Sequence, residues 1–116
     1  MREAPGSDGR ALALLGLARR AGRVALGTQA VLAAADSAAG LHLVLVARDA
    51  GGNARDRVLP KLRARGVPWR ECGTAAQLAR ALGRGRVVVA GVSEPGLAER
   101  LCRLLDDGSQ EMPAGT

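Results

Sequence analysis

Aromatic side chains are nearly absent from this chain of 116 residues, in which Trp69 is the single aromatic residue. Domains that stack unpaired bases on Phe, Tyr or Trp side chains are therefore excluded. Histidine occurs once, as His42, and the two cysteines, Cys72 and Cys102, have no CxxC spacing. The chain thus lacks the ligand set of a zinc site or of a c-type haem site.

Long apolar runs and an export signal are missing as well. The longest wholly apolar runs are too short to span a bilayer, and no signal peptide opens the chain. A disulfide could form between the two cysteines, but a core of this size does not need one. We therefore expect a soluble, cytoplasmic protein that does not contact membranes.

Acidic residues are scarce in the middle of the chain. The whole sequence has 17 basic and 11 acidic residues, a net charge of +6, but residues 10–86 hold 14 basic and 4 acidic residues, a local balance of +10. Codon bias in a GC-rich genome would explain why Lys61 is the single lysine, but not why both signs are unevenly placed. This part of the chain is predicted to face a polyanion.

Motifs for catalysis and nucleotide binding are also absent. The sequence contains no GxGxxG fingerprint, Walker loop or GxSxG elbow, and no carboxylate pair with an acid or base partner. Asp49 and the following Gly51-Gly52-Asn53 turn could hold an anion at the end of a strand, but any strand-to-helix turn needs such residues. We expect no enzyme, no cofactor and no metal.

Helical and strand patterns alternate along the sequence. Apolar residues at helical spacing predict helices that start near residues 10, 28, 54, 75 and 94. Short apolar runs predict strands at residues 24–26, 41–47, 67–72 and 87–92, and the second and fourth are apolar enough to be covered on both faces. This order predicts an α/β fold, in which two helix layers enclose a small, largely parallel or mixed four-stranded sheet.

Both ends of the chain are polar and rich in small residues. Residues 1–9 are expected to form a flexible lead-in and residues 106–116 a disordered tail. A single domain over residues 10–105 remains.

Several residues are predicted to shape the helix ends. Pro60 lies inside the third helical pattern, so that helix either bends there or starts at Leu59. The predicted N-caps are Asp8, Asn53 and Ser93, and Thr74 with Gln77 forms a capping box.

Two groups of basic residues leave alternatives open. Arg19, Arg20 and Arg23 gather at the end of the first helix, where they either complement the helix dipole or bind a partner. The second group lies at steps of four along the third helix and consists of Arg57, Lys61 and Arg65. These residues form either a solvated basic stripe or a contact with phosphate.

Three long segments together resemble a known family. They read LLGLARRAGRVALGTQAVL, LVLVARDAGGNARDRV and GVPWRECGTAAQLARALGRGRVVVAGVSEPGLAERLCRLL. In these the chain is similar, over roughly residues 10–105, to the bacterial YlxQ-like branch of the L-seven-Ae family of large-subunit ribosomal proteins. The resemblance implies a three-layer α/β/α sandwich that binds kink-turn RNA, a sharply bent duplex with tandem sheared G·A pairs.

The resemblance also implies a binding site at the start of the second helix. There the family carries a GTNExxK-like motif whose polar side chains read the edges of the guanines. Gly27 and Thr28 match this motif, and Gln29 takes its Asn position. Ala30 and Ala33 take the Glu and Lys positions, so two of the three reading side chains are replaced.

The resemblance further implies that the loop before the last strand forms the other side of this site. Relatives place apolar residues there, whereas this chain has Arg84, Gly85 and Arg86. Two guanidinium forks suit phosphate clamping. Arg48 and Thr74 match positions that flank the same face.

The sequence therefore predicts a non-enzymatic RNA-binding protein of the kink-turn type. Its expected partner is structured RNA, such as ribosomal RNA or the ribosome, and not DNA. One alternative is an accessory domain that binds a protein or the ribosome without kink-turn specificity. Another is the substrate-binding half of an RNA 2′-O-methyltransferase, for which this chain is too short to include the catalytic half.

Overall fold

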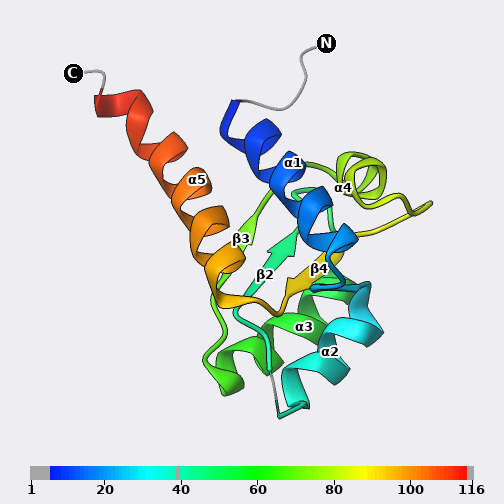
Figure 1. Ribbon diagram of the computed structural model, residues 1–116. Coiled ribbons are helices and arrows are strands. Elements are labelled where there is room, and N and C mark those ends of the chain that lie inside the picture. Colours follow the sequence, from blue (N-terminus) through cyan, green and yellow to red (C-terminus); the bar gives the residue numbers. More distant parts are fainter. Residues whose placement is uncertain (1–5, 39, 115–116) are drawn as a thin grey trace.

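Helices and strands alternate strictly along the chain, as the sequence predicts (Figure 1). The computed structural model describes residues 6–38 and 40–114. In chain order the elements are α1 (Gly6–Arg20), β1 (Val24–Leu26), α2 (Thr28–Asp36), β2 (Leu43–Val46), α3 (Gly52–Arg65), β3 (Trp69–Glu71), α4 (Ala75–Leu82), β4 (Val89–Val92) and α5 (Pro95–Ala114).

The four strands form one mixed sheet in the order β1-β4-β2-β3. β2 pairs with β3 in parallel, whereas β4 is antiparallel to both of its neighbours, β1 and β2. The carboxyl ends of β1, β2 and β3 therefore meet the amino end of β4 at the same edge of the sheet. We call this edge, which comprises residues 27, 47–48, 72–73 and 88–89, the carboxyl edge.

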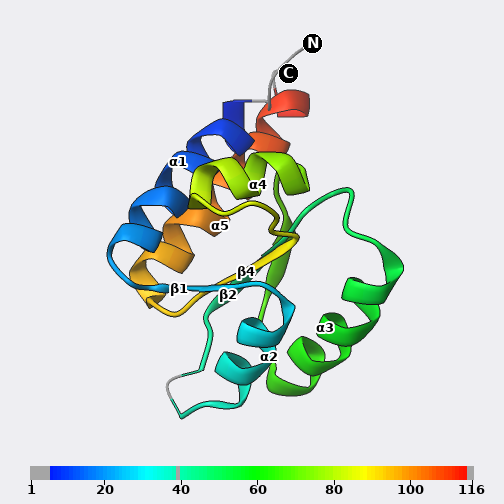
Figure 2. The same cartoon turned by 90° about the vertical axis from the view of Figure 1, so that its right-hand side faces the viewer.

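Helices cover both faces of the sheet, which confirms the three-layer α/β/α sandwich (Figure 2). α1 packs between α4 and α5 on one face, and α2 packs against α3 on the other. Every residue of β2 and β4 is buried, because these two strands lie in the middle of the sheet with helices on both sides. The apolar runs that predicted doubly covered strands are thus the centre of the core.

The outer strands are less buried than the inner ones. β1 and β3 are half-buried along their whole length and are the two outermost strands of the sheet. Trp69, the single aromatic residue, begins β3 and packs against the core from this outer strand. It is therefore a structural residue of the sheet.

The first helix begins earlier than the sequence suggests. α1 starts at Gly6 rather than near residue 10, and Asp8 lies inside the helix, so its prediction as an N-cap is wrong. Its carboxylate is buried and binds Arg48 and the backbone N–H of Gly73, both far away in the sequence. A charged partner and a buried N–H outcompete the local backbone for this carboxylate.

The last helix extends beyond the boundary expected at residue 105. α5 runs without interruption from Pro95 to Ala114. The rest of the predicted lead-in and tail, residues 1–5 and 115–116, lies outside the described residues.

Two further predicted N-caps are also wrong. The residue before α3 is Gly51, which makes no side-chain cap, and Asn53 lies in the first turn of the helix. Before α5, the carboxylate of Glu94 accepts a hydrogen bond from the N–H of Leu97 at 2.6 Å, whereas the hydroxyl of Ser93 bonds to the carbonyl of Arg23. Because proline occupies the first helical position here, the capping position falls to Glu94 rather than Ser93.

The structure also decides the two questions about α3 and α4. α3 starts at Gly52 and continues through Pro60, so it does not start at Leu59. The capping box of α4 is confirmed: Gln77 donates its N–H to Thr74 Oγ1 at 3.2 Å and accepts the N–H of Thr74 at 2.9 Å.

Candidate functional site

Backbone hydrogen bonds join the loops at the carboxyl edge into one surface. The N–H of Gly27 bonds to the carbonyl of Val89 at 2.9 Å, the N–H of Ala47 to that of Val88 at 2.8 Å, and the N–H of Arg48 to that of Gly73 at 2.8 Å. The β1–α2, β2–α3 and β3–α4 loops therefore lie side by side, and the α4–β4 loop leads into them. Six of the eight site residues predicted from the sequence lie in these four loops: Gly27, Arg48, Thr74, Arg84, Gly85 and Arg86. The other two, Thr28 and Gln29, begin α2.

The start of α2 is open to a ligand. Gly27 occupies the N-cap position with φ 92° and ψ 165°, and no side chain caps the helix. The first turn contains no acidic residue, and Gln29 is exposed. The backbone N–H groups at the start of a helix have no partner within it, and they coincide with the positive end of its dipole. This helix start therefore presents unpaired donors at the carboxyl edge.

The start of α4, at the same edge, is closed. Thr74 and Gln77 form the capping box, and Asp49 Oδ1 accepts the N–H of Ala75 at 2.8 Å. The N–H of Gly73 is taken by Asp8 at 3.0 Å. The hydroxyl of Thr74 and the carboxylate of Asp49 thus already serve this helix, which gives Thr74 a structural role.

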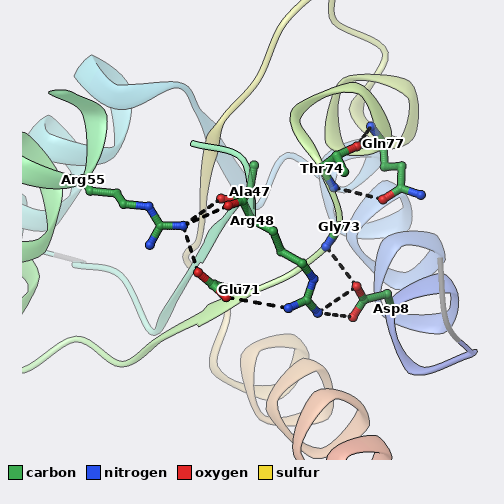
Figure 3. A network of polar contacts seen from close by, with 8 residues as sticks. All are labelled: Asp8, Ala47, Arg48, Arg55, Glu71, Gly73, Thr74 and Gln77. Atoms are coloured by element: carbon green, nitrogen blue, oxygen red, sulfur yellow. Dashed lines mark hydrogen bonds and ion pairs between the residues drawn. The ribbon is translucent and has the colours of Figure 1, made fainter. Parts of the chain in front are cut away.

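A network of charged side chains supports one side of the carboxyl edge (Figure 3). Arg48 Nη2 donates to both carboxylate oxygens of Asp8, at 3.1 and 2.9 Å, and Arg48 Nη1 lies 3.7 Å from Glu71 Oε1. Arg55 Nη2 donates to Glu71 Oε2 at 2.8 Å and to the carbonyl of Ala47 at 3.2 Å. The network ties α1, the β2–α3 loop, α3 and β3 together.

Arg48 is therefore both a predicted site residue and a structural one. Its side chain is 48% exposed, whereas that of Asp8 is 3% exposed. The hydrogen bond to Asp8 is the main cause that raises the pKa of Arg48 above its ordinary value. Because two carboxylates already bind this guanidinium, Arg48 is less available to a phosphate than its position suggests.

Two residues of the basic stripe expected on α3 share one ion-pair partner. Lys61 Nζ lies 3.0 Å from Asp36 Oδ2, and Arg65 binds the same carboxylate, which lies at the end of α2. These hydrogen bonds, from Arg65 first and Lys61 second, hold the pKa of Asp36 below its ordinary value. Lys61 and Arg65 therefore join α3 to α2 by ion pairs at the surface, a role that the spacing alone does not predict.

Exposed arginines that make no ion pair with any described side chain lie on several elements, including Arg57 and Arg63 on α3. The arginines of the α4–β4 loop, Arg84 and Arg86, are exposed, and neither makes an ion pair within residues 8–38 and 40–106. The same holds for the arginines near the end of α1: Arg19, Arg20 and Arg23.

Sequence reasoning missed the two residues that support the carboxyl edge. Asp8 bonds to Arg48 across 40 positions and to Gly73 across 65, and Arg55 reaches Glu71 across 16. No local pattern marks such pairs. The one available signal is an acidic residue in an otherwise small and apolar helical segment.

Two kinds of site are not found in the part of the chain that the structure describes. No three His, Cys, Asp or Glu side chains gather there as they would around a metal ion. None of the helices in that part is both long enough and apolar enough to cross a membrane.

The mixed sheet between two helix layers, with a glycine-started helix at its carboxyl edge, is an L-seven-Ae-like fold. No family model matches the sequence. The RNA-binding protein YlxQ of Bacillus subtilis (strain 168) is 37% identical to it over 93 residues, which are 80% of this chain and 92% of that protein. The chain belongs to the YlxQ family.

Two solved structures share this fold. A protein of unknown function from Bacillus halodurans C is 33% identical and superposes with a TM-score of 0.77, covering 83% of this chain and 96% of that one. The 15.5kD RNA binding protein of Giardia lamblia superposes with a TM-score of 0.74, covering 93% of this chain and 92% of that one. At 17% identity, this second likeness shows the shared fold alone.

Proposed function

We propose that the chain is a non-catalytic RNA-binding protein that binds a kinked RNA duplex at the carboxyl edge. The observation that carries the proposal is the uncapped start of α2 beside an exposed arginine loop. The name of the Bacillus subtilis relative, an RNA-binding protein, supports the same partner.

The start of α2 has the chemistry to bind a phosphate or a base edge. Unpaired N–H groups and the helix dipole attract an anion, and glycine at the N-cap lets an RNA backbone come close. A Cβ built at Gly27 would meet no atom within 4 Å, so the space beside it is open. The exposed amide of Gln29 can both donate to and accept from a base edge, as Asn does in the family motif.

The α4–β4 loop supplies the opposite wall of the site. Arg84 and Arg86 each carry a planar fork of donors that can bind a phosphate bidentately. Ala30 and Ala33 are exposed on α2 and offer no side-chain polar group to a guanine. The protein therefore recognises the bent backbone through its phosphates and reads bases through Gln29 and backbone donors.

The test compares a kink-turn RNA with a straight duplex of equal length and charge. We expect the kink-turn RNA to bind at least about tenfold more tightly, because only the bend brings phosphates to both walls at once. The double substitution Thr28→Ala/Gln29→Ala should weaken binding to the kink-turn RNA and leave binding to the straight duplex unchanged.

The chain offers a matched control for this variant. Asn53 occupies the same helical position in α3 as Gln29 does in α2, and α3 also starts at a glycine without a side-chain cap. Asn53→Ala should leave both affinities unchanged. Equal affinity for the two RNAs, with the same salt dependence, would reduce the protein to a general basic binder and refute the proposal.

A further inference from the structure

A second group of arginines lies at the far end of β1 from the start of α2. Arg19 and Arg20 end α1 and Arg23 precedes β1, and all three are exposed. We call these three residues the arginine corner. None of them makes an ion pair with the side chains that the structure describes.

The end of α1 does not need these side chains as caps. The N–H of Gly22 bonds to the carbonyl of Arg19 and the N–H of Arg23 to that of Ala18, both at 3.0 Å. Gly22 has φ 75°, so this is a glycine C-cap of the Schellman type, in which the backbone itself satisfies the last carbonyls. The three guanidinium groups are thus available to a partner.

The acidic residue next to the corner is already engaged. Ser93 donates its N–H to the carbonyl of Arg23 at 3.0 Å, which brings Glu94 close to the corner. The carboxylate of Glu94 caps α5 by accepting the N–H of Leu97. The corner is therefore a concentration of positive charge, and the carboxylate of Glu94 already serves α5.

The corner lies at one end of β1, and the start of α2 lies at the other. β1 is an edge strand, and four residue steps of about 3.3 Å put Arg23 roughly 13 Å from Gly27. α1 and α4 lie side by side (Figures 1 and 2). A Cβ built at Gly16 would lie 3.1 Å from the carbonyl oxygen of Ala81.

We propose that the arginine corner binds the phosphates of a double-stranded stem next to the kink in the same RNA. A double helix carries on the order of one charge per 1.7 Å of its axis, so a rigid stem that leaves the start of α2 along β1 presents several phosphates over 13 Å. Arginine forks suit such contacts, and they need no aromatic side chains. The inference rests on the proposed function and names the part of the RNA that extends the site.

The test uses two RNAs with the same kink and different stems. In one the stem on the β1 side is cut back to the kink, and in the other it is one helical turn longer. The variant Arg19→Gln/Arg20→Gln/Arg23→Gln is compared with Arg10→Gln/Arg57→Gln/Arg63→Gln, which removes the same charge from three other exposed arginines. Affinity is measured by fluorescence anisotropy over a range of salt concentrations.

The corner variant should lose about tenfold or more in affinity for the long-stem RNA, and the slope of log K against log salt should fall by about 2 to 3. On the short-stem RNA it should bind like the wild-type protein, and the control variant should show no dependence on stem length. Arg23→Gln alone, which lies outside the helix, should lower the slope on the long-stem RNA by about 1.

Equal losses on both RNAs, or the same loss in the control variant, would overturn the inference. So would a lower melting temperature of the corner variant with unchanged affinity, because the arginines would then serve only the helix dipole. Failure of the proposed function has a different signature: the wild-type protein would not distinguish a kinked from a straight RNA.

Discussion

Replacing Asp8 with alanine removes an acceptor that two separate parts of the carboxyl edge share. The carboxylate is buried, and it receives hydrogen bonds from Arg48 at 2.9 and 3.1 Å and from the N–H of Gly73 at 3.0 Å. The substitution therefore breaks an ion pair and leaves a buried backbone donor without a partner.

The expected cost follows from these two losses. A hydrogen bond to a charged group contributes about 1.5 to 3 kcal/mol, and the lower value applies here because Arg48 is half-exposed and water can solvate it again. An unsatisfied buried N–H at Gly73 costs about 1 to 3 kcal/mol. Together Asp8→Ala should lower the free energy of unfolding by about 3 kcal/mol, and Asp8→Asn, which keeps an acceptor for Gly73, by about half as much.

Urea unfolding at neutral pH measures both values, and a double-mutant cycle with Arg48→Ala should give a coupling of about 1.5 kcal/mol. In the folded Asp8→Ala protein, the amide of Gly73 should exchange its hydrogen faster than in the wild type. A loss below about 0.5 kcal/mol, typical of surface substitutions, would refute the reasoning. So would a coupling of zero.

Three further predictions concern other parts of the molecule. Gly27→Ala should lower the free energy of unfolding by about 1 to 3 kcal/mol in urea, because φ 92° with ψ 165° is open essentially to glycine alone; Gly51→Ala, at φ −73°, is the control and should change little. Two basic side chains of α3 lower the pKa of Asp36, so its carboxylate stabilises the fold fully at pH values above its ordinary pKa. This stabilisation is lost as the pH falls through the lower pKa that Asp36 has in the folded protein. Asp36→Asn should therefore lower the free energy of unfolding at neutral pH but not in strong acid. An equal loss at the two pH values, measured by urea unfolding, would contradict this. Burial raises the pKa of Cys72 to about 12, so iodoacetamide should modify the half-buried Cys102 in the folded protein and Cys72 only after unfolding, as mass spectrometry would detect.

The features that the sequence predicted well are those with local causes. β2 and β4 are marked by apolar runs, and helices cover them on both faces. The Thr74–Gln77 capping box needs only residues within one helical turn. The alternation of helices and strands followed from such local patterns, and it limited the fold to a layered α/β architecture.

The features that the sequence missed depend on contacts between distant segments. Asp8 and Ser93 are both good N-cap residues, but the first binds Arg48 and the second the carbonyl of Arg23. Lys61 and Arg65 follow the spacing of a solvated stripe, whereas both bind Asp36 on a neighbouring helix. Periodicity places a side chain on a face of its helix, but it does not say which charge lies opposite.

For the candidate site, the sequence resemblance indicated loops that the fold brings together, but not the state of each residue. The sheet topology explains why loops so far apart in the chain meet at one edge. Only the structure distinguishes Gly27 and Gln29, at an uncapped helix start, from Thr74 and Arg48, whose polar groups are already bound. Capping and ion pairing decide which groups of a site are left for a ligand.

The most direct test of the RNA site is a titration of the ¹⁵N-labelled protein with a kink-turn RNA, followed through the backbone amide resonances. We predict the largest shift changes at Thr28, Gln29 and Ala30, with a second group at residues 84–86, and much smaller changes when the straight duplex is added. Changes centred on the outer face of α3, or the same pattern with both RNAs, would contradict the account.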